Sequence, residues 1–97
     1  MITGFGDKAT KDVYNGVASR EARSIPKELW PIARRKLDMI NVANELKDLQ
    51  APPSNRLERL KGKLSGFWSI RINDQFRVVF RFEPGSASDV EIVDYHR

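Results

Sequence analysis

Apolar and polar residues alternate with a period of two through the second half of the chain. This alternation is typical of strands, because successive side chains of a strand point to opposite faces of a sheet. We expect four strands, at residues 56–60, 66–72, 75–83 and 89–95. The last three are separated by short turn sequences, Asn73-Asp74 and Pro84-Gly85, which predict antiparallel neighbours.

The strand at 75–83 has two chemically different faces. One is apolar and is expected to pack in the core: Phe76, Val78, Phe80 and Phe82. Arg77, Val79 and Arg81 share the other face. We expect that face to be open to solvent, as one face of an antiparallel sheet can be.

The first half of the chain shows helical spacing instead. Asp7 is a candidate N-cap for a short helix that ends near Gly16. A longer helix is expected to begin between Ser24 and Lys27, because Pro26 suits the first turn of a helix.

Apolar residues recur at intervals of three and four in the longer helix, which predicts one buried face. This face consists of Leu29, Ile32, Ala33, Leu37 and Ile40. The charged residues are expected to point to water: Arg34, Arg35, Lys36 and Asp38. The helix is expected to loosen at residues 41–44, to add a turn at 45–49 and to end at the prolines of 51–55.

Two helices followed by a run of strands predict an α+β fold, with both helices packed on one face of a small twisted, mainly antiparallel sheet. Residues 2–5 are expected to add a short strand. The length of 97 residues suits a single domain, 1–97, rather than two.

Composition excludes several classes of protein. No apolar run approaches the roughly 20 residues of a membrane span, and residues 1–12 lack the basic and apolar regions of a signal peptide. The chain has no cysteine, so it has neither disulfides nor a thiolate metal site. We therefore expect a cytoplasmic protein with no membrane association.

The net charge of +4 is unevenly distributed. Residues 56–81 carry seven basic residues against Glu58 and Asp74. Such a block suggests a polyanionic partner, because Lys and Arg that neutralise phosphates release counterions. A solvated strand surface is the alternative reading of the same residues.

The sequence NRLERLKGKLSGFWSIRINDQFRVVFRF, followed by VEIVDYH, resembles the HigB branch of the RelE/ParE toxin superfamily. The pieces that carry the resemblance are Asn55-Arg56-Leu57, Leu60-Lys61-Gly62, Gly66 to Ser69, Asn73 to Arg77, and Asp94-Tyr95-His96. The resemblance implies a RelE/ParE-like fold and the toxin of a type II toxin–antitoxin system. It further implies an endoribonuclease that cuts mRNA in the ribosomal decoding site, without a metal or cofactor. A helix-turn-helix antitoxin would be its partner, and the free toxin is expected to be monomeric.

Metal-free RNA cleavage needs a base for the ribose 2′-OH, an acid for the departing 5′-oxygen, and cations for the charged phosphorane. The residues matched to the family supply these groups: Lys61, Arg77, Asp94, Tyr95 and His96. His96 is the natural proton carrier, Arg77 and Lys61 would clamp phosphate, and Tyr95 would stack on a base or donate its hydroxyl. We expect further RNA contacts from Arg56, Arg59, Lys63 and Arg71.

The general base remains open between Glu58 and the C-terminal residues His96 and Asp94. Some HigB relatives have histidine where this chain has Glu58, so Glu58 either replaces it as the base or leaves that role to His96 and Asp94. A bend at the end of the last strand is expected to bring Asp94, Tyr95 and His96 to Lys61 and Arg77. Glu58, Asp94 and His96 offer too few ligands for a convincing metal site.

Two other functions use the same features. A ParE-like protein would inhibit DNA gyrase without catalysis on the same scaffold, since fold does not fix function. A catalytically degenerate relative would bind RNA or ribosomes through the basic block yet leave the message intact.

Overall fold

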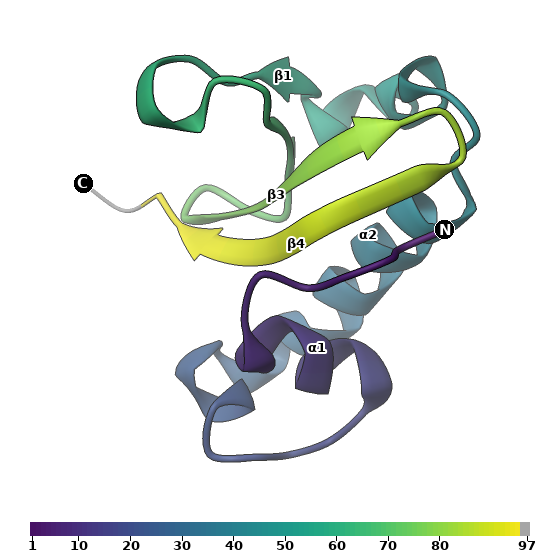
Figure 1. Cartoon of the computed structure of the whole chain (residues 1–97). Helices are drawn as coiled ribbons and strands as arrows, with labels where there is room; N and C mark the ends of the chain where they lie inside the picture. The colour runs from purple at the N-terminus through teal and green to yellow at the C-terminus, as the bar shows by residue number, and fades with distance from the viewer. Residues whose placement is uncertain (96–97) are drawn as a thin grey trace.

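The structure is a computed structural model that describes residues 1–95. It contains two α-helices, α1 (Lys8–Asn15) and α2 (Trp30–Val42), followed by four strands (Figure 1). The prediction that concerns His96 lies outside the described residues.

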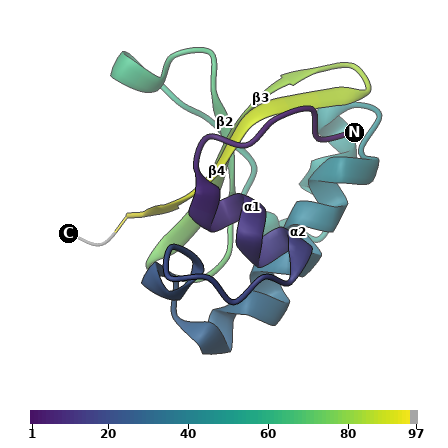
Figure 2. The same ribbon diagram turned by 60° about the horizontal axis from the view of Figure 1, so that its bottom comes forward.

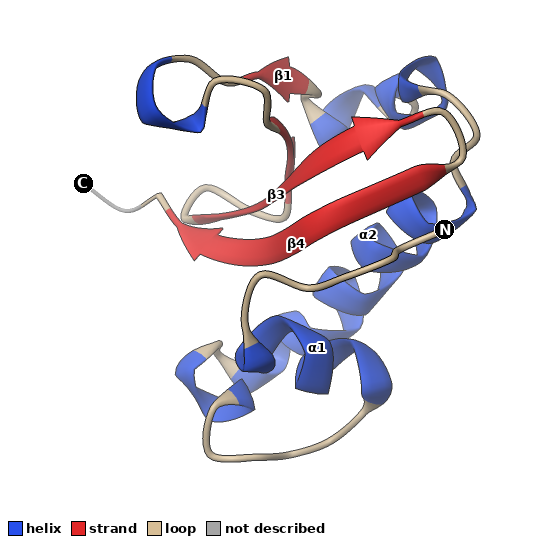
Figure 3. Ribbon diagram, in the orientation of Figure 1, coloured by secondary structure: helices blue, strands red, loops and turns tan. Residues whose placement is uncertain are grey.

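The strands form one antiparallel sheet in the order β1-β2-β3-β4 (Figure 3). Their bounds are β1 (Glu58–Arg59), β2 (Trp68–Arg71), β3 (Phe76–Glu83) and β4 (Ser86–Asp94). All four expected strands are confirmed, although the first is only two residues long.

The N-terminal segment runs beside β4 and adds two parallel bridges to the sheet, Ile2 with Ala87 and Phe5 with Val90 (Figure 1). The backbone of Gly6 continues this contact, because its N–H donates to the carbonyl oxygen of Val90 at 2.8 Å. The short strand expected at residues 2–5 is therefore present as an extended segment, and the sheet is mainly antiparallel as predicted.

Both helices lie on the same side of the sheet (Figure 2), which confirms the α+β architecture. The Asp7 side chain accepts a hydrogen bond from the backbone N–H of Thr10 at 2.9 Å and caps α1, as expected. Gly16 ends α1 with a left-handed φ of 74°. A short 3₁₀ turn at Lys27–Leu29 leads into α2.

The core lies between the helices and β2 to β4. Leu37 and Ile40 of α2 and Val78 and Phe80 of β3 are all fully buried. The apolar face predicted for β3 is thus confirmed, with Phe82 only partly buried at its end. No helix within residues 1–95 is long and apolar enough to cross a membrane.

Two expectations about the helical half are wrong. Lys36 was expected to point to water, but it is buried, with 8% of its surface exposed. Its amine can be buried because the Asn55 side chain accepts a hydrogen bond from it. The segment 51–55 also does not end all helical structure, since Pro53–Asn55 forms a 3₁₀ turn, in which proline is tolerated at the first position.

Candidate functional site

The sheet register places several predicted site residues on its face away from the helices. Arg71 of β2 lies directly opposite Arg77 of β3, and Arg77 lies opposite Val93 of β4. Tyr95 follows Val93 by two residues and therefore points to the same face. The Arg77 guanidinium carbon lies 5.9 Å from the centre of the Tyr95 ring, within the range of a cation–π contact.

Arg77 is held by groups from the segment before β2. Its Nη2 donates to the backbone carbonyl oxygen of Arg56 at 2.6 Å. Its Nη1 lies 3.3 Å from Glu58 Oε1 in an ion pair. Only 12% of the Arg77 side chain is exposed, and its buried Nε has no hydrogen-bond partner within residues 1–95. The guanidinium is therefore oriented, yet one of its donors is unused.

A cavity of about 230 Å³ opens beside this guanidinium, and we call it the arginine cavity. It is lined by Arg56, Arg71, Asn73, Asp74, Arg77 and Tyr95. Arg71 forms an ion pair with the exposed Asp74, and Arg77 forms one with Glu58 outside the lining, so three cations are accompanied by two carboxylates. An excess of positive charge with an aromatic ring beside it suits a phosphate joined to a base.

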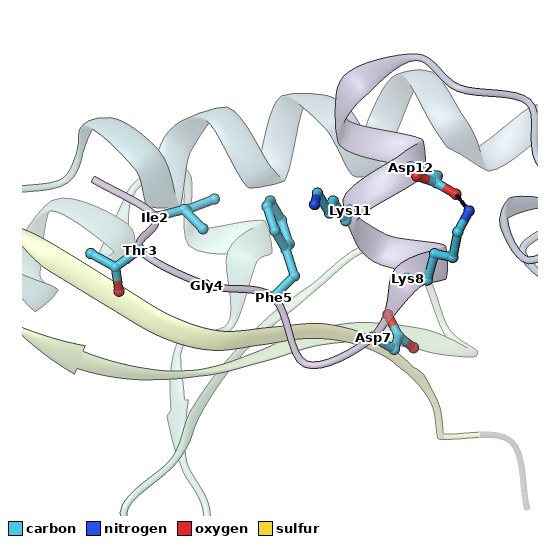
Figure 4. Close-up of a pocket in the computed structure, with 8 residues that line it drawn as sticks. All are labelled: Ile2, Thr3, Gly4, Phe5, Asp7, Lys8, Lys11 and Asp12. Carbon is cyan, nitrogen blue, oxygen red and sulfur yellow. Dashed lines mark hydrogen bonds and ion pairs between the residues drawn. The ribbon is translucent and has the colours of Figure 1, made fainter.

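A larger cavity of about 640 Å³ lies between the N-terminal segment and α1 (Figure 4). Lys8 in its lining is paired with Asp12 (Figure 4), and none of the predicted site residues lines it. Its two lysines face two aspartates, so it lacks the charge excess of the arginine cavity.

Four predicted site residues line the arginine cavity: Arg56, Arg71, Arg77 and Tyr95. A fifth, Glu58, does not line it but contacts Arg77. Asp94 is not among them, because it lies opposite Phe76 on the other face of β4 and accepts a hydrogen bond from Gln75 Nε2 at 3.1 Å. The bend expected at the end of the last strand does not occur up to the N–H of Tyr95, which still donates to the Gln75 carbonyl oxygen at 2.6 Å. The part of this expectation that concerns His96 lies outside the described residues.

The remaining basic residues lie in the connection from β1 to β2. Lys61 and Lys63 are exposed beside the 3₁₀ turn at Gly62–Leu64, and Arg59 lies 6.0 Å from the centre of the Trp68 ring. None of these three lines the arginine cavity. Their roles in RNA binding stay predictions.

Two residues behind the site were missed as functional candidates, Lys36 and Asn55. Asn55 is fully buried and accepts a hydrogen bond from Lys36 Nζ at 2.5 Å. Burial, together with the positive charges of Arg35 and Arg71, lowers the pKa of Lys36. A sequence signal existed, because Lys36 lies three residues after Ala33 and four before Ile40, at the spacing of the buried stripe.

The arrangement can bind a phosphate and stack a base, and it places the Glu58 carboxylate beside Arg77. No group of three or more His, Cys, Asp or Glu side chains that could hold a metal ion occurs within residues 1–95.

Comparison with known proteins gives consistent matches along the whole chain. The family model described as "RelE-like toxin of type II toxin-antitoxin system HigB" matches residues 3–96. Toxin HigB-1 of Vibrio cholerae is 37% identical over 87 residues, which cover 90% of this chain and 90% of that protein. Endoribonuclease HigB of Proteus vulgaris is 31% identical over 97 residues, covering 99% of this chain and 100% of that protein.

Solved structures share the fold at lower identity. A chain of the YoeB–YefM complex from Staphylococcus aureus matches with a TM-score of 0.60 and 20% identity, covering 100% of this chain and 97% of that one. The YoeB/ParE toxin from Agrobacterium tumefaciens matches with a TM-score of 0.52 and 19% identity, covering 99% of this chain and 98% of that one.

Proposed function

This chain belongs to the HigB-like family of RelE-like toxins from type II toxin–antitoxin systems, and we propose that it is an endoribonuclease that cleaves mRNA on the translating ribosome. The observation that carries the proposal is the arginine cavity, where Arg77 is oriented by two partners and lies beside Tyr95. A relative that shares 31% of its residues along nearly the whole chain is named as an endoribonuclease.

In this proposal Arg77 binds the scissile phosphate and stabilises the charge of the phosphorane. Arg56 and Arg71 hold the same or a neighbouring phosphate, and Tyr95 stacks on a base. Fixed cations that face a developing negative charge are typically worth about as much as, or more than, proton transfer in lowering the barrier.

Cleavage proceeds by attack of the ribose 2′-oxygen on phosphorus while the bond to the 5′-oxygen breaks. One group takes the 2′-OH proton and another gives a proton to the 5′-oxygen. Glu58 and His96 are the two candidates for the base. Glu58 lies beside Arg77 in the structure, whereas His96 lies outside the described residues.

We also propose that a cognate helix-turn-helix antitoxin holds the toxin inactive in the cytoplasm. Its family implies a cognate antitoxin, and a similar structure is a toxin–antitoxin complex. An antitoxin that covers the arginine cavity would block access of mRNA.

The test is to map mRNA 5′ ends after brief expression of the wild type and of Arg77→Ala. We expect cuts within translated message for the wild type and at least a 100-fold loss for the variant, the typical effect of removing one oriented donor. Arg81→Ala is the matched control, because Arg81 is on the same strand, is exposed, and pairs with Asp89 instead. Intact mRNA together with DNA damage would identify a gyrase inhibitor and overturn the proposal.

The same assay with Glu58→Gln and His96→Gln assigns the base. The variant that lacks the base should lose about 100- to 10,000-fold in cleavage rate while it still binds RNA. If both variants cleave at the wild-type rate, neither residue is the base.

A further inference from the structure

The Asn55 side chain joins α2 to the segment 49–51 behind the arginine cavity. Its Oδ1 accepts from Lys36 Nζ of α2. Its Nδ2 donates to the carbonyl oxygens of Leu49 at 3.1 Å and Ala51 at 3.3 Å. Both the oxygen and the nitrogen of the Asn55 side-chain amide are therefore hydrogen-bonded. These bonds fix the segment that leads from α2 to β1 at this point.

Lys36 is an unusual partner for this amide. Lysine is almost never fully buried unless it is paired, yet no carboxylate forms an ion pair with Lys36 within residues 1–95. Burial of an unpaired charge is costly, and leucine or methionine would fill the same position in the stripe at lower cost. The retained amine indicates a role beyond packing.

The residue after Asn55 connects this pair to the site. Arg56 is not glycine, but its backbone is left-handed, with φ 46° and ψ 56°. Residues other than glycine adopt this conformation only when their surroundings impose it. This conformation places the Arg56 carbonyl oxygen 2.6 Å from Arg77 Nη2. Asn55 precedes Arg56 in the chain and is held in place by Lys36. It therefore fixes the backbone next to the left-handed residue.

We propose that Lys36 and Asn55 are positioning residues that orient Arg77 through the Arg56 carbonyl. Lys36 anchors Asn55, Asn55 fixes the turn before β1, and the turn presents the carbonyl that holds the phosphate-binding guanidinium. This inference rests on the proposed function for its catalytic consequence, but the orientation of Arg77 can be measured without RNA.

The informative variant is Lys36→Met, which keeps the buried stem and removes the amine. It removes a buried charge but leaves Asn55 Oδ1 without its donor, so we expect the unfolding midpoint to change little. We expect kcat for RNA cleavage to fall on the order of 100-fold, the typical cost of a 1 Å displacement in a site, with KM nearly unchanged. In an Arg77→Lys background, Lys36→Met should lower kcat by less than about twofold, because the arginine that Lys36 positions is gone.

The matched control is Thr10→Val. Thr10 is fully buried, and its Oγ1 accepts a hydrogen bond from the Ile92 N–H at 2.8 Å, away from the arginine cavity. This variant should lower stability without a specific loss of kcat. Two outcomes would contradict the positioning role. One is a loss of kcat in Lys36→Met that only matches its loss of stability. The other is an equally large loss of kcat when Lys36→Met is made in the Arg77→Lys background.

The NMR signal of the Arg77 Nε–H supplies the readout that is independent of RNA. We expect it to shift and to exchange faster with solvent in Lys36→Met, and to be unchanged in Thr10→Val. An unchanged signal in Lys36→Met would overturn the inference. If the signal moves as expected but the wild type leaves RNA intact, the positioning stands and the proposed function fails.

Discussion

Arg77 is oriented before any ligand binds. The Arg56 carbonyl, the Glu58 carboxylate and the Tyr95 ring each contact its guanidinium. A cation that is already in place costs less side-chain entropy on binding. On the function proposed above, Glu58 would compete with phosphate for Arg77, so a bound phosphate would have to displace or share this ion pair.

Tyr14 gives a prediction about alkaline pH. Its hydroxyl donates to Asp38 Oδ1 at 2.8 Å. Burial, followed by this hydrogen bond and the charge of Asp38, raises the pKa of Tyr14 to about 12. An unfolded tyrosine has a pKa of about 10, so the unfolded state loses the proton first. The stability that Tyr14 contributes is therefore fully present below about pH 10 and is lost as the pH rises through about 12.

Urea unfolding at several pH values from 8 to about 12 tests this linkage. We expect the wild type to lose more stability over this window than Tyr14→Phe, which has no proton to release. Lysines titrate in the same window, and the difference between the two proteins cancels their effect. Parallel curves for the two proteins would contradict the pKa assignment.

At the scale of elements, α1 shows how local signals define a boundary. Asp7 caps its start, and Gly16 ends it in a left-handed conformation. The N–H of Val17 then donates to the Asp12 carbonyl oxygen at 2.8 Å and satisfies the last turn. These signals involve neighbours in sequence, which explains why both ends were predictable.

Gly16→Ala should destabilise the protein by about 1 kcal/mol, because alanine is strained in the left-handed region. Gly4→Ala is the control, since its added Cβ would meet no atom within 4 Å and its φ is not in the left-handed region. Thermal unfolding should show a lower midpoint for Gly16→Ala and almost none of this shift for Gly4→Ala. Equal shifts would contradict the role of backbone conformation.

The prediction of elements succeeded where periodicity alone determines them. The apolar face of β3 followed from alternation, and the antiparallel order followed from short turns. The opposite face was wrongly expected to be open to solvent, since Val79 on it is only 4% exposed. Lys36 was misplaced because residue type was given more weight than helical position. The contact of its amine with Asn55, 19 residues later, is a tertiary feature that no local pattern encodes.

The candidate site was predictable only in part. The alternation of β4 correctly predicted that Asp94 and Tyr95 point to opposite faces of the sheet. The bend expected to bring both side chains to one site does not occur up to Tyr95. The contact of Arg77 with the Arg56 carbonyl could not be predicted, because it depends on the left-handed backbone of a residue that is not glycine.

At the scale of the whole molecule, three of the seven basic residues of 56–81, namely Arg56, Arg71 and Arg77, line one cavity. If Arg56, Arg71 and Arg77 each neutralise one phosphate of single-stranded RNA, the logarithm of the binding constant should fall with the logarithm of salt concentration with a slope of about −2. Fluorescence anisotropy with an RNA oligonucleotide over a range of salt concentrations measures this slope.

Arg71→Ala should reduce the magnitude of that slope by about 0.7, the contribution of one phosphate on a single strand. Arg81→Ala should leave it unchanged, because Arg81 does not line the arginine cavity. If both variants changed the slope equally, binding would be spread over the surface rather than concentrated at the cavity.

The pairing of the N-terminal segment with β4 constrains when this protein can become folded. The Thr3 hydroxyl donates to the Ala87 carbonyl oxygen, 84 residues later in the chain. During synthesis, residue 3 must wait for residue 87 to leave the ribosome before this edge of the sheet can close. Contacts of such long sequence separation form late. A nascent chain from which residue 87 is still missing therefore lacks this edge of the sheet, and with it part of the fold on which the function proposed above depends.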